Sequence, residues 1–159
     1  VLRAKTAVLF EAACEVGAMS GGADAAGRRA LALYGLELGN AFQLVDDALD
    51  YGGQSGTLGK NVGDDLREGK MTLPVILALE QASESERAII ASALGNAAAT
   101  DLEVHQVVAI FNRYDTLNRT LAKARDHAAA AIAALAELPE SEMKSILADV
   151  VQHSVSRAS

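Results

Sequence analysis

Hydrophobic residues recur at three- and four-residue spacing along most of the chain, which is the period of an amphipathic α-helix. Glycine pairs, prolines and clusters of small polar residues interrupt this pattern and divide it into segments. The segments predict helices over residues 2–19, 24–51, 71–81, 83–94, 101–113, 116–138 and 139–155. No segment keeps the strict alternation that is typical of strands, so the sequence predicts an all-α fold.

Short motifs predict where several of these helices begin. Ser83 and Glu86 have the spacing of a capping box, and Asp101 is expected to cap the next helix. Pro74 is compatible with the first turn of a helix, because N–H groups there have no intrahelical partner. Pro139 is expected to begin the last helix.

Residues 52–70 lack a hydrophobic period and are rich in glycine, lysine and aspartate, so a long connection is expected there. Connections of this length inside compact domains usually have a function. The Gly59-Lys60 pair suggests a P-loop, but its spacing from Gly53 is one residue too long, and Asn61 replaces the hydroxyl residue of that motif. The segment is therefore not a Walker loop, although a lysine beside a glycine can still bring charge to a phosphate.

Length and composition indicate a globular protein that can bury a core. The chain has 159 residues, half of them hydrophobic, and a single domain is expected over residues 1–159. The net charge of −7 argues against nucleic acid or an anionic membrane as a partner recruited by overall charge. The sequence has no apolar run long enough to span a membrane and no signal-peptide pattern, so we expect a soluble cytoplasmic protein, not an integral membrane protein.

The single cysteine and the three histidines carry no chemical signal of their own. Cys14 lies in an alanine-rich segment and is expected to be a small core residue. His105, His127 and His153 are too far apart in sequence to form a local pair of metal ligands, and we interpret them as ordinary helix residues.

A group of carboxylates lies near the end of the second predicted helix. At ~100° per residue, Gln43, Asp46, Asp47 and Asp50 fall on one face of that helix. Aspartate is a poor residue within a helix, and like charges three or four residues apart repel one another. We call Asp46, Asp47 and Asp50 the aspartate stripe.

Two interpretations of the aspartate stripe stay open on spacing alone. It is either a solvated acidic face or a site for a hard divalent cation. Mg²⁺ retains most of its water and is usually shared between one or two carboxylates and a substrate phosphate. Lys5 leaves a similar choice, because a lysine among apolar residues either extends its ammonium into water or faces an anion.

Taken together, these segments resemble the C-terminal half of the trans-isoprenyl diphosphate synthases, which elongate an allylic diphosphate with isopentenyl diphosphate. The second aspartate-rich motif of that family, Gly-x-x-Phe-Gln-x-x-Asp-Asp-x-x-Asp, is matched by Gly39, Phe42, Gln43, Asp46, Asp47 and Asp50. Its Lys-Thr pair, its Gly-Lys-x-x-Gly-x-Asp motif and the following Gly-Lys are matched by Lys5, Thr6, Gly59, Lys60, Gly63, Asp65, Gly69 and Lys70. The segment Thr72-Leu73-Pro74 also fits. The chain is most similar to long-chain members that make the octaprenyl or decaprenyl tail of ubiquinone.

The resemblance implies an isoprenoid-synthase helical bundle, a homodimer and a magnesium-dependent prenyltransferase. Asp46 would bind Mg²⁺ directly, with Asp47 and Asp50 acting through metal-bound water. The positive charges that neutralise the departing diphosphate would come from Lys5, Lys60 and Lys70. The residues beside the reacting carbon would be Thr6 and Gln43.

The same resemblance suggests where the growing chain would lie. Small or apolar residues of the first predicted helix would line part of a tunnel, although an ordinary core would have the same composition. These residues are Ala7, Phe10, Ala13 and Cys14.

One part of the family pattern is missing from this sequence. The family has a first aspartate-rich motif on an earlier helix, together with basic residues that hold isopentenyl diphosphate. Adjacent aspartates occur here only at Asp46-Asp47 and Asp64-Asp65. We therefore expect a C-terminal fragment of the enzyme that is inactive alone. A non-catalytic subunit of a heteromeric synthase and a class I terpene cyclase stay open as alternatives.

Overall fold

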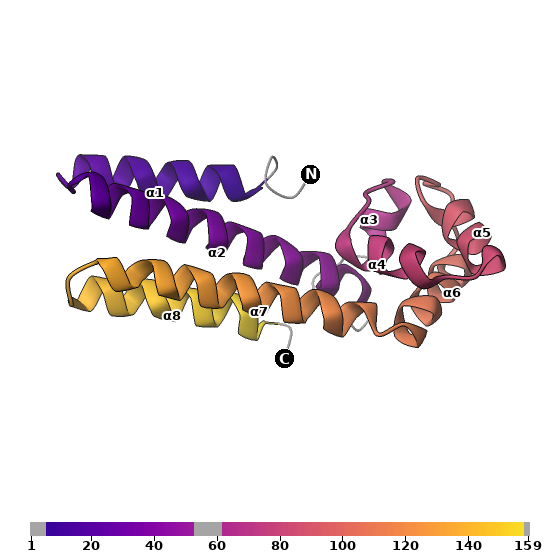
Figure 1. Cartoon of the computed structure of the whole chain (residues 1–159). Helices are drawn as coiled ribbons and strands as arrows, with labels where there is room; N and C mark the ends of the chain where they lie inside the picture. Colours follow the sequence, from indigo (N-terminus) through magenta and orange to yellow (C-terminus); the bar gives the residue numbers. More distant parts are fainter. Residues whose placement is uncertain (1–5, 53–61, 158–159) are drawn as a thin grey trace. The chain divides into compact units, whose positions relative to one another are not determined.

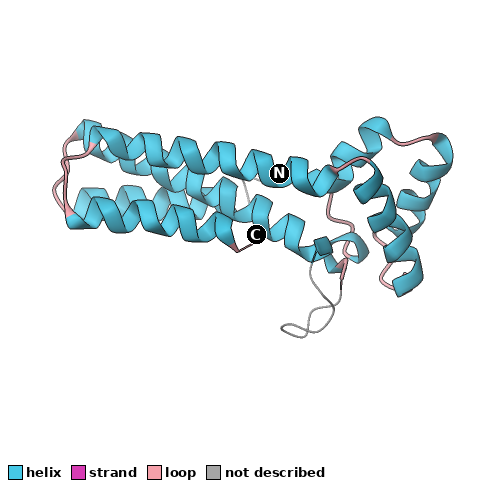
Figure 2. Cartoon of the chain, turned by 90° about the horizontal axis from the view of Figure 1, so that it is seen from below, coloured by secondary structure: helices cyan, strands magenta, loops and turns pink. Residues whose placement is uncertain are grey.

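The computed structural model describes residues 6–52 and 62–157, so residues 1–5, 53–61 and 158–159 lie outside the described part of the chain. The described residues form helices and loops without a strand (Figure 2), as the sequence predicts. The chain divides into two compact units, one comprising Val1–Val45 with Ala122–Ser159 and the other Asp46–Leu121. We call them unit 1 and unit 2. The single domain expected over residues 1–159 stays a prediction.

Unit 1 consists of long helices that lie side by side in both views (Figures 1 and 2). The long helices are α1 (Val8–Ser20), the greater part of α2 (Ala25–Gly52), most of α7 (Thr116–Ala134) and α8 (Glu142–Ser156). The short 3-10 helix η2 (Leu135–Glu137) follows α7. Their buried residues form one core, made of Tyr34, Leu38, Ala41, Ala128, Ala131, Ala134, Leu135 and Val151. The Tyr34 hydroxyl donates a hydrogen bond to the carbonyl of Leu147 at 2.9 Å, which ties α2 to α8.

Helices α1 and α2 approach closely because α2 has glycine where α1 crosses it. A Cβ atom at Gly35 would lie 2.4 Å from the carbonyl oxygen of Phe10 and 2.9 Å from the sulfur of Cys14. A Cβ atom at Gly39 would lie 2.6 Å from the Cα atom of Ala7. Since these distances are below van der Waals contact, only glycine permits this spacing of the two backbones.

Unit 2 is a cluster of shorter helices (Figure 1). They are α3 (Asp64–Arg67), α4 (Leu73–Gln81), α5 (Glu84–Ala93) and α6 (Asp101–Arg113). The core that they share with the end of α2 includes Tyr51, Leu66, Val75, Ile90, Val104, Val107 and Phe111. The rings of Tyr51 and Phe111 meet edge to face with centroids 5.0 Å apart, a favourable aromatic geometry.

Most helices begin and end near their predicted boundaries, and the differences have local causes. The capping box of Ser83 and Glu86 is present, but α6 is capped by Thr100, which forms its own capping box with Glu103, so the prediction of Asp101 as the cap was wrong. The connection expected over 52–70 contains the short helix α3.

The last two helices also differ from the prediction. Helix α7 ends at Ala134, and the residues expected to continue it to 138 form η2 instead. Helix α8 begins after Ser141, whose side chain accepts a hydrogen bond from the N–H of Lys144, so Pro139 does not open it. A serine side chain satisfies a first-turn N–H group, which proline cannot do.

None of the helices in the described ranges is long and apolar enough to cross a membrane. The outward face of α1 nevertheless carries apolar side chains, including Leu9 at 69% and Val16 at 60% exposure.

Candidate functional site

Thr6 and Gln43, two predicted site residues of unit 1, are in direct contact. The Thr6 hydroxyl donates a hydrogen bond to Oε1 of Gln43 at 2.6 Å. Thr6 lies in a π-helical turn just before α1, and such wide turns occur frequently at functional sites. The contact depends on the close spacing of α1 and α2, since Ala7 next to Thr6 packs on Gly39, one helical turn before Gln43.

The aspartate stripe occupies the last turns of α2, which belong to unit 2. Asp47 is buried at 3% exposure, whereas Asp46 and Asp50 are partly exposed. The Asp50 carboxylate accepts a hydrogen bond from the backbone N–H of Asp65 at 3.1 Å. The carbonyl of Asp50 accepts a second one from the N–H of Gly63 at 2.9 Å. The backbone N–H groups of Gly63 and Asp65 therefore hold the end of this helix.

Glycine at position 63 makes these contacts possible. Gly63 has a φ of +80°, in the left-handed region that favours glycine. A Cβ atom there would lie 2.5 Å from Cγ1 of Val104 in α6. Any other residue would strain the backbone and push the turn away from α6, and with it the two N–H groups that reach Asp50.

Lys70, predicted to bind diphosphate, is engaged with carboxylates of its own segment. Its ammonium lies 2.5 Å from Oδ1 of Asp65 and 2.6 Å from Oε2 of Glu68. These hydrogen bonds, with that to Asp65 first, raise the pKa of Lys70 above its usual value, so the side chain stays charged. A diphosphate that reached Lys70 would compete with two carboxylates.

Tyr51, the residue after Asp50, links the end of α2 to the Thr72-Leu73-Pro74 segment through a contact between hydroxyl groups. The hydroxyls of Tyr51 and Thr72 are 3.3 Å apart, and both residues are buried. Burial is the main reason why the pKa of Tyr51 is raised well above its ordinary value, so the phenol stays neutral. Pro74 lies in the first turn of α4, as predicted.

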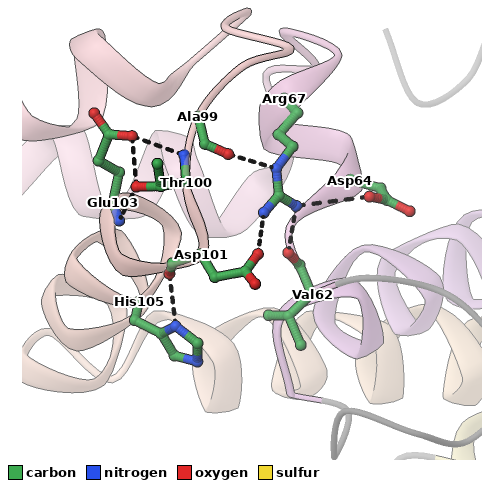
Figure 3. A network of polar contacts seen from close by, with 8 residues as sticks. All are labelled: Val62, Asp64, Arg67, Ala99, Thr100, Asp101, Glu103 and His105. Atoms are coloured by element: carbon green, nitrogen blue, oxygen red, sulfur yellow. Dashed lines mark hydrogen bonds and ion pairs between the residues drawn. The ribbon is translucent and has the colours of Figure 1, made fainter.

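The sequence did not indicate Arg67, which makes the largest set of polar contacts around this turn (Figure 3). Its side chain is only 14% exposed. Two partners of Arg67, Ala99 and Asp101, lie more than thirty residues away in sequence. No local sequence pattern relates residues at that separation.

The oxygens of the aspartate stripe are of the kind that a divalent cation binds. Within the described ranges, no three acidic, histidine or cysteine side chains are grouped so that they could hold a metal ion by themselves. Carboxylate oxygens are the ligands that Mg²⁺ prefers, and Mg²⁺ needs only one or two of them when water and a substrate phosphate complete its shell. The donor set therefore fits a hydrated divalent cation held jointly with a phosphate.

Lys5 and Lys60 lie outside the described residues. Of the residues predicted to line a tunnel, Ala7, Phe10 and Cys14 face α2, and the ring of Phe10 lies 5.8 Å from that of Phe42. Ala13 is exposed. Their role as a tunnel stays a prediction.

Comparison with known proteins gives the family. A family model described as polyprenyl synthetase matches residues 1–111. The chain belongs to the polyprenyl synthetase family. This assignment confirms the resemblance that was drawn from the aspartate stripe and the glycine-lysine motifs.

Named relatives match nearly the whole chain. The octaprenyl diphosphate synthase of Haemophilus influenzae is 41% identical over 157 residues, which make up 99% of this chain and 47% of that protein. The octaprenyl diphosphate synthase of Escherichia coli is 38% identical, with 99% and 48% covered. The chain thus spans about half the length of the curated relatives it matches.

Solved structures show the same fold. A decaprenyl diphosphate synthase from Rhodobacter capsulatus superposes with a TM-score of 0.90 at 42% identity, covering 99% of this chain and 49% of that one. A polyprenyl synthase from Caulobacter crescentus, in complex with calcium and isoprenyl diphosphate, gives a TM-score of 0.89 at 45% identity, covering 99% and 48%. The fold of this chain is that of the isoprenyl diphosphate synthases.

Proposed function

We propose that this chain supplies the C-terminal half of a long-chain prenyltransferase that condenses isopentenyl diphosphate with an allylic diphosphate. The observation that carries the proposal is the aspartate stripe at the end of α2, with the Asp50 carboxylate fixed by the N–H of Asp65. Family membership and the octaprenyl and decaprenyl synthases among the relatives support the substrate class and a product of that length.

The proposed reaction breaks the bond between the allylic carbon and its diphosphate oxygen. The double bond of isopentenyl diphosphate attacks the resulting allylic cation, a new carbon–carbon bond forms, and the proton that is lost passes to the released diphosphate. Thr6 and Gln43, joined by their hydrogen bond, would present a fixed polar pair beside the reacting carbon. Fixed dipoles and charges that face developing charge stabilise a transition state without reorganisation.

Mg²⁺ is the proposed cofactor. Asp46 would hold it directly, and Asp47 and Asp50 would hold its water ligands. When bound, the ion supplies positive charge that stabilises the leaving diphosphate. The structures of relatives with calcium or magnesium and isoprenyl diphosphate support a divalent cation at this kind of site.

Lys5 and Lys60 are the lysines that we propose for neutralising the diphosphate. Lys70 is the third, but its pairing with Asp65 and Glu68 gives it a second role in shaping the turn that reaches Asp50. A homodimer and a cytoplasmic location belong to the same proposal, by analogy with the family. A heteromeric synthase is the second candidate, because one relative at 37% identity is named a heptaprenyl diphosphate synthase component 2.

The metal assignment is tested by measuring how far ligands stabilise the complete enzyme. By complete enzyme we mean this chain together with the part of the polypeptide that its relatives have and this chain does not cover. A ligand at 100 times its dissociation constant stabilises the native state by about 2.7 kcal/mol. Mg²⁺ with diphosphate should therefore raise the Tm of the wild type, and Asp46→Ala should remove most of that gain. Asp149→Ala, which alters an exposed aspartate of α8, is the control and should keep it. An equal gain in wild type and Asp46→Ala would contradict the assignment.

Product analysis tests the reaction itself. Radiolabelled isopentenyl diphosphate with an allylic primer should give a linear polyprenyl diphosphate in the presence of Mg²⁺ and none after chelation. A cyclic hydrocarbon formed from the allylic diphosphate alone would instead indicate a class I terpene cyclase. Condensation only when a second, different polypeptide is added would favour the heteromeric synthase.

A further inference from the structure

Arg67, in α3 of unit 2, binds groups from two separate segments with all three of its guanidinium nitrogens (Figure 3). Nε donates to the carbonyl of Ala99 at 3.1 Å, and Nη1 donates to the carbonyl of Val62 at 2.8 Å. Nη2 donates to Oδ1 of Asp101, also at 2.8 Å. Ala99 and Asp101 flank the N-cap of α6, so the guanidinium joins the turn before α3 to the start of α6.

The contact with Val62 bears directly on the aspartate stripe. The carbonyl of Val62 and the N–H of Gly63 belong to the same peptide group, which is planar and rigid. The carbonyl accepts from Arg67, and the N–H donates to the carbonyl of Asp50. The position of the guanidinium therefore fixes the orientation of the peptide that holds the end of α2.

The same turn also carries the group that binds the Asp50 side chain. Asp65 lies two residues after Gly63, and its N–H donates to Oδ2 of Asp50. Since Asp50 has both its carbonyl and its carboxylate bound to this turn, a movement of the turn changes the direction of the carboxylate.

We propose that Arg67 is a positioning residue, which sets the Asp50 carboxylate toward a divalent cation and diphosphate through the Val62–Gly63 peptide and the Asp65 N–H. The proposal rests on the proposed function for the identity of that ligand. Some residues do not bind a metal themselves but orient the residues that do. Mutation of such a residue typically changes metal affinity 10- to 100-fold. Lysine cannot replace arginine here, because one ammonium does not reproduce the planar fork that meets three acceptors.

A purely structural role for Arg67 would predict a different result. In that case its replacement would lower the stability of unit 2 without changing the response of the folded enzyme to Mg²⁺. Arg113 provides the control, because it also joins two helices of unit 2, through its ion pair with Glu86 of α5. Arg113→Lys should lower stability alone.

The experiment compares wild type, Arg67→Lys and Arg113→Lys in the complete enzyme, with Tm measured against Mg²⁺ concentration at fixed diphosphate. We expect Arg67→Lys to raise the Mg²⁺ concentration for half-maximal stabilisation about 10-fold or more, and to lower kcat more than it raises the KM for the allylic diphosphate. Arg113→Lys should keep both values within about twofold of the wild type, since its ion pair is with Glu86 of α5. A midpoint for Arg67→Lys within twofold of the wild type would overturn the proposal.

Two further outcomes are informative. If Arg67→Lys does not fold, Asp101→Ala removes one of the three hydrogen-bond acceptors of Arg67 and should shift the Mg²⁺ midpoint in the same direction by a smaller factor; no shift would overturn the proposal. If the wild type itself gives no response to Mg²⁺ and diphosphate, the proposed function fails, and the role of Arg67 toward that ligand fails with it. A response in the wild type that Arg67→Lys shares in full removes the role of Arg67 alone.

Discussion

At the scale of single residues, Asp50 of the aspartate stripe shows how backbone groups hold a carboxylate in place. Asp50 is bound at both its carbonyl and its side chain by the N–H groups of Gly63 and Asp65. Backbone donors in a tight turn cannot rotate away as a long side chain can, so the direction of the carboxylate is set by the fold. This arrangement is what a site needs when the ligand is a hydrated cation that brings few constraints of its own.

Glu86 is a second carboxylate with fixed donors, and it gives a pH-dependent prediction. It is buried and accepts hydrogen bonds from Ser83, through both its N–H and its hydroxyl, from the Tyr114 hydroxyl and from Arg113. The backbone hydrogen bond from Ser83 is the largest cause that lowers the pKa of Glu86 from 4.5 to about 2. Because the folded pKa lies below the unfolded one, the stabilisation is fully present above pH 4.5 and is lost as the pH falls toward 2.

We therefore expect Glu86→Gln to have a lower Tm than the wild type at pH 7 and the same Tm near pH 2. The difference should decrease mainly between pH 4.5 and 2, where Glu86 becomes protonated in the wild type. Thermal unfolding followed by circular dichroism across this range measures it. Glu103→Gln, in the exposed capping box of α6, is the matched control and should show a smaller difference. A Tm difference that does not depend on pH would contradict the assignment.

At the scale of elements, the glycines of α2 decide how close α1 can come. Ala7, Phe10 and Cys14 recur at three- and four-residue spacing on α1 and meet Gly35 and Gly39, which are four residues apart on α2. Burial against this surface raises the pKa of the Cys14 thiol. Cys14 is partly buried and packs against the core of unit 1, so it lies at the edge of the core and not within it, and its thiol stays protonated.

Gly39→Ala should destabilise the protein and lower its activity. The added methyl would lie 2.6 Å from the Cα of Ala7, so the backbone of α1 must move. Overpacking of this kind costs about 1–3 kcal/mol, and over most of that range the roughly 1 kcal/mol that alanine gains over glycine in helix propensity offsets only part of the cost. The shift should also lengthen the hydrogen bond between Thr6 and Gln43. Urea unfolding and kcat of the complete enzyme measure the two effects.

Gly17→Ala in α1 is the control for this prediction. A Cβ atom at Gly17 has nothing within 4 Å, so the substitution should stabilise the helix by roughly 0.5–1 kcal/mol. If both variants were stabilised by a similar amount, the close contact between α1 and α2 would not be required. If Gly39→Ala lost stability but kept the kcat of the wild type, the Thr6–Gln43 pair would have no role in the reaction.

The sequence predicted the elements well where the signal is local. The capping box of Ser83 and Glu86 and the stripe of Asp46, Asp47 and Asp50 depend on spacings of three or four residues, which a helix fixes directly. The start of α6 was misassigned because Thr100 and Asp101 are both good caps, and the choice falls to Thr100, whose Glu103 completes the box. When two neighbouring residues could both cap a helix, the side chain with which each one pairs decides which of them does so.

Contacts distant in sequence were not predictable in the same way. The bond between Arg67 and Ala99 joins residues 32 positions apart, and that between Thr6 and Gln43 joins residues 37 apart. No hydrophobic period or cap relates such pairs; they depend on how whole helices pack. The family motif named Thr6 and Gln43 as candidates, and the structure shows that they are in contact, whereas Arg67 was found only in the structure.

At the scale of the whole molecule, the proposed reaction is expected to need a second acidic element besides the aspartate stripe. The aspartate stripe is present, and the other adjacent pair, Asp64-Asp65, lies in the turn that supports it. The relatives are about twice as long as this chain. We infer that the remaining metal ligands and the site for isopentenyl diphosphate lie in the part of the relatives that this chain does not cover.

The 159-residue chain on its own should therefore show condensation only at background level. On the proposed function, the aspartate stripe shares a cation with a diphosphate, and the remaining metal ligands and the site for the second substrate are expected in the part of the relatives that this chain does not cover. Radiolabelled isopentenyl diphosphate with an allylic primer and Mg²⁺ measures the turnover, and far-UV circular dichroism establishes that the chain is helical in the same buffer. The complete enzyme, assayed in parallel, should turn over and should lose its activity on Asp46→Ala. Robust condensation by the folded chain alone would show that every essential group lies within these 159 residues, and the second acidic element would then have to be sought among the carboxylates around Asp65.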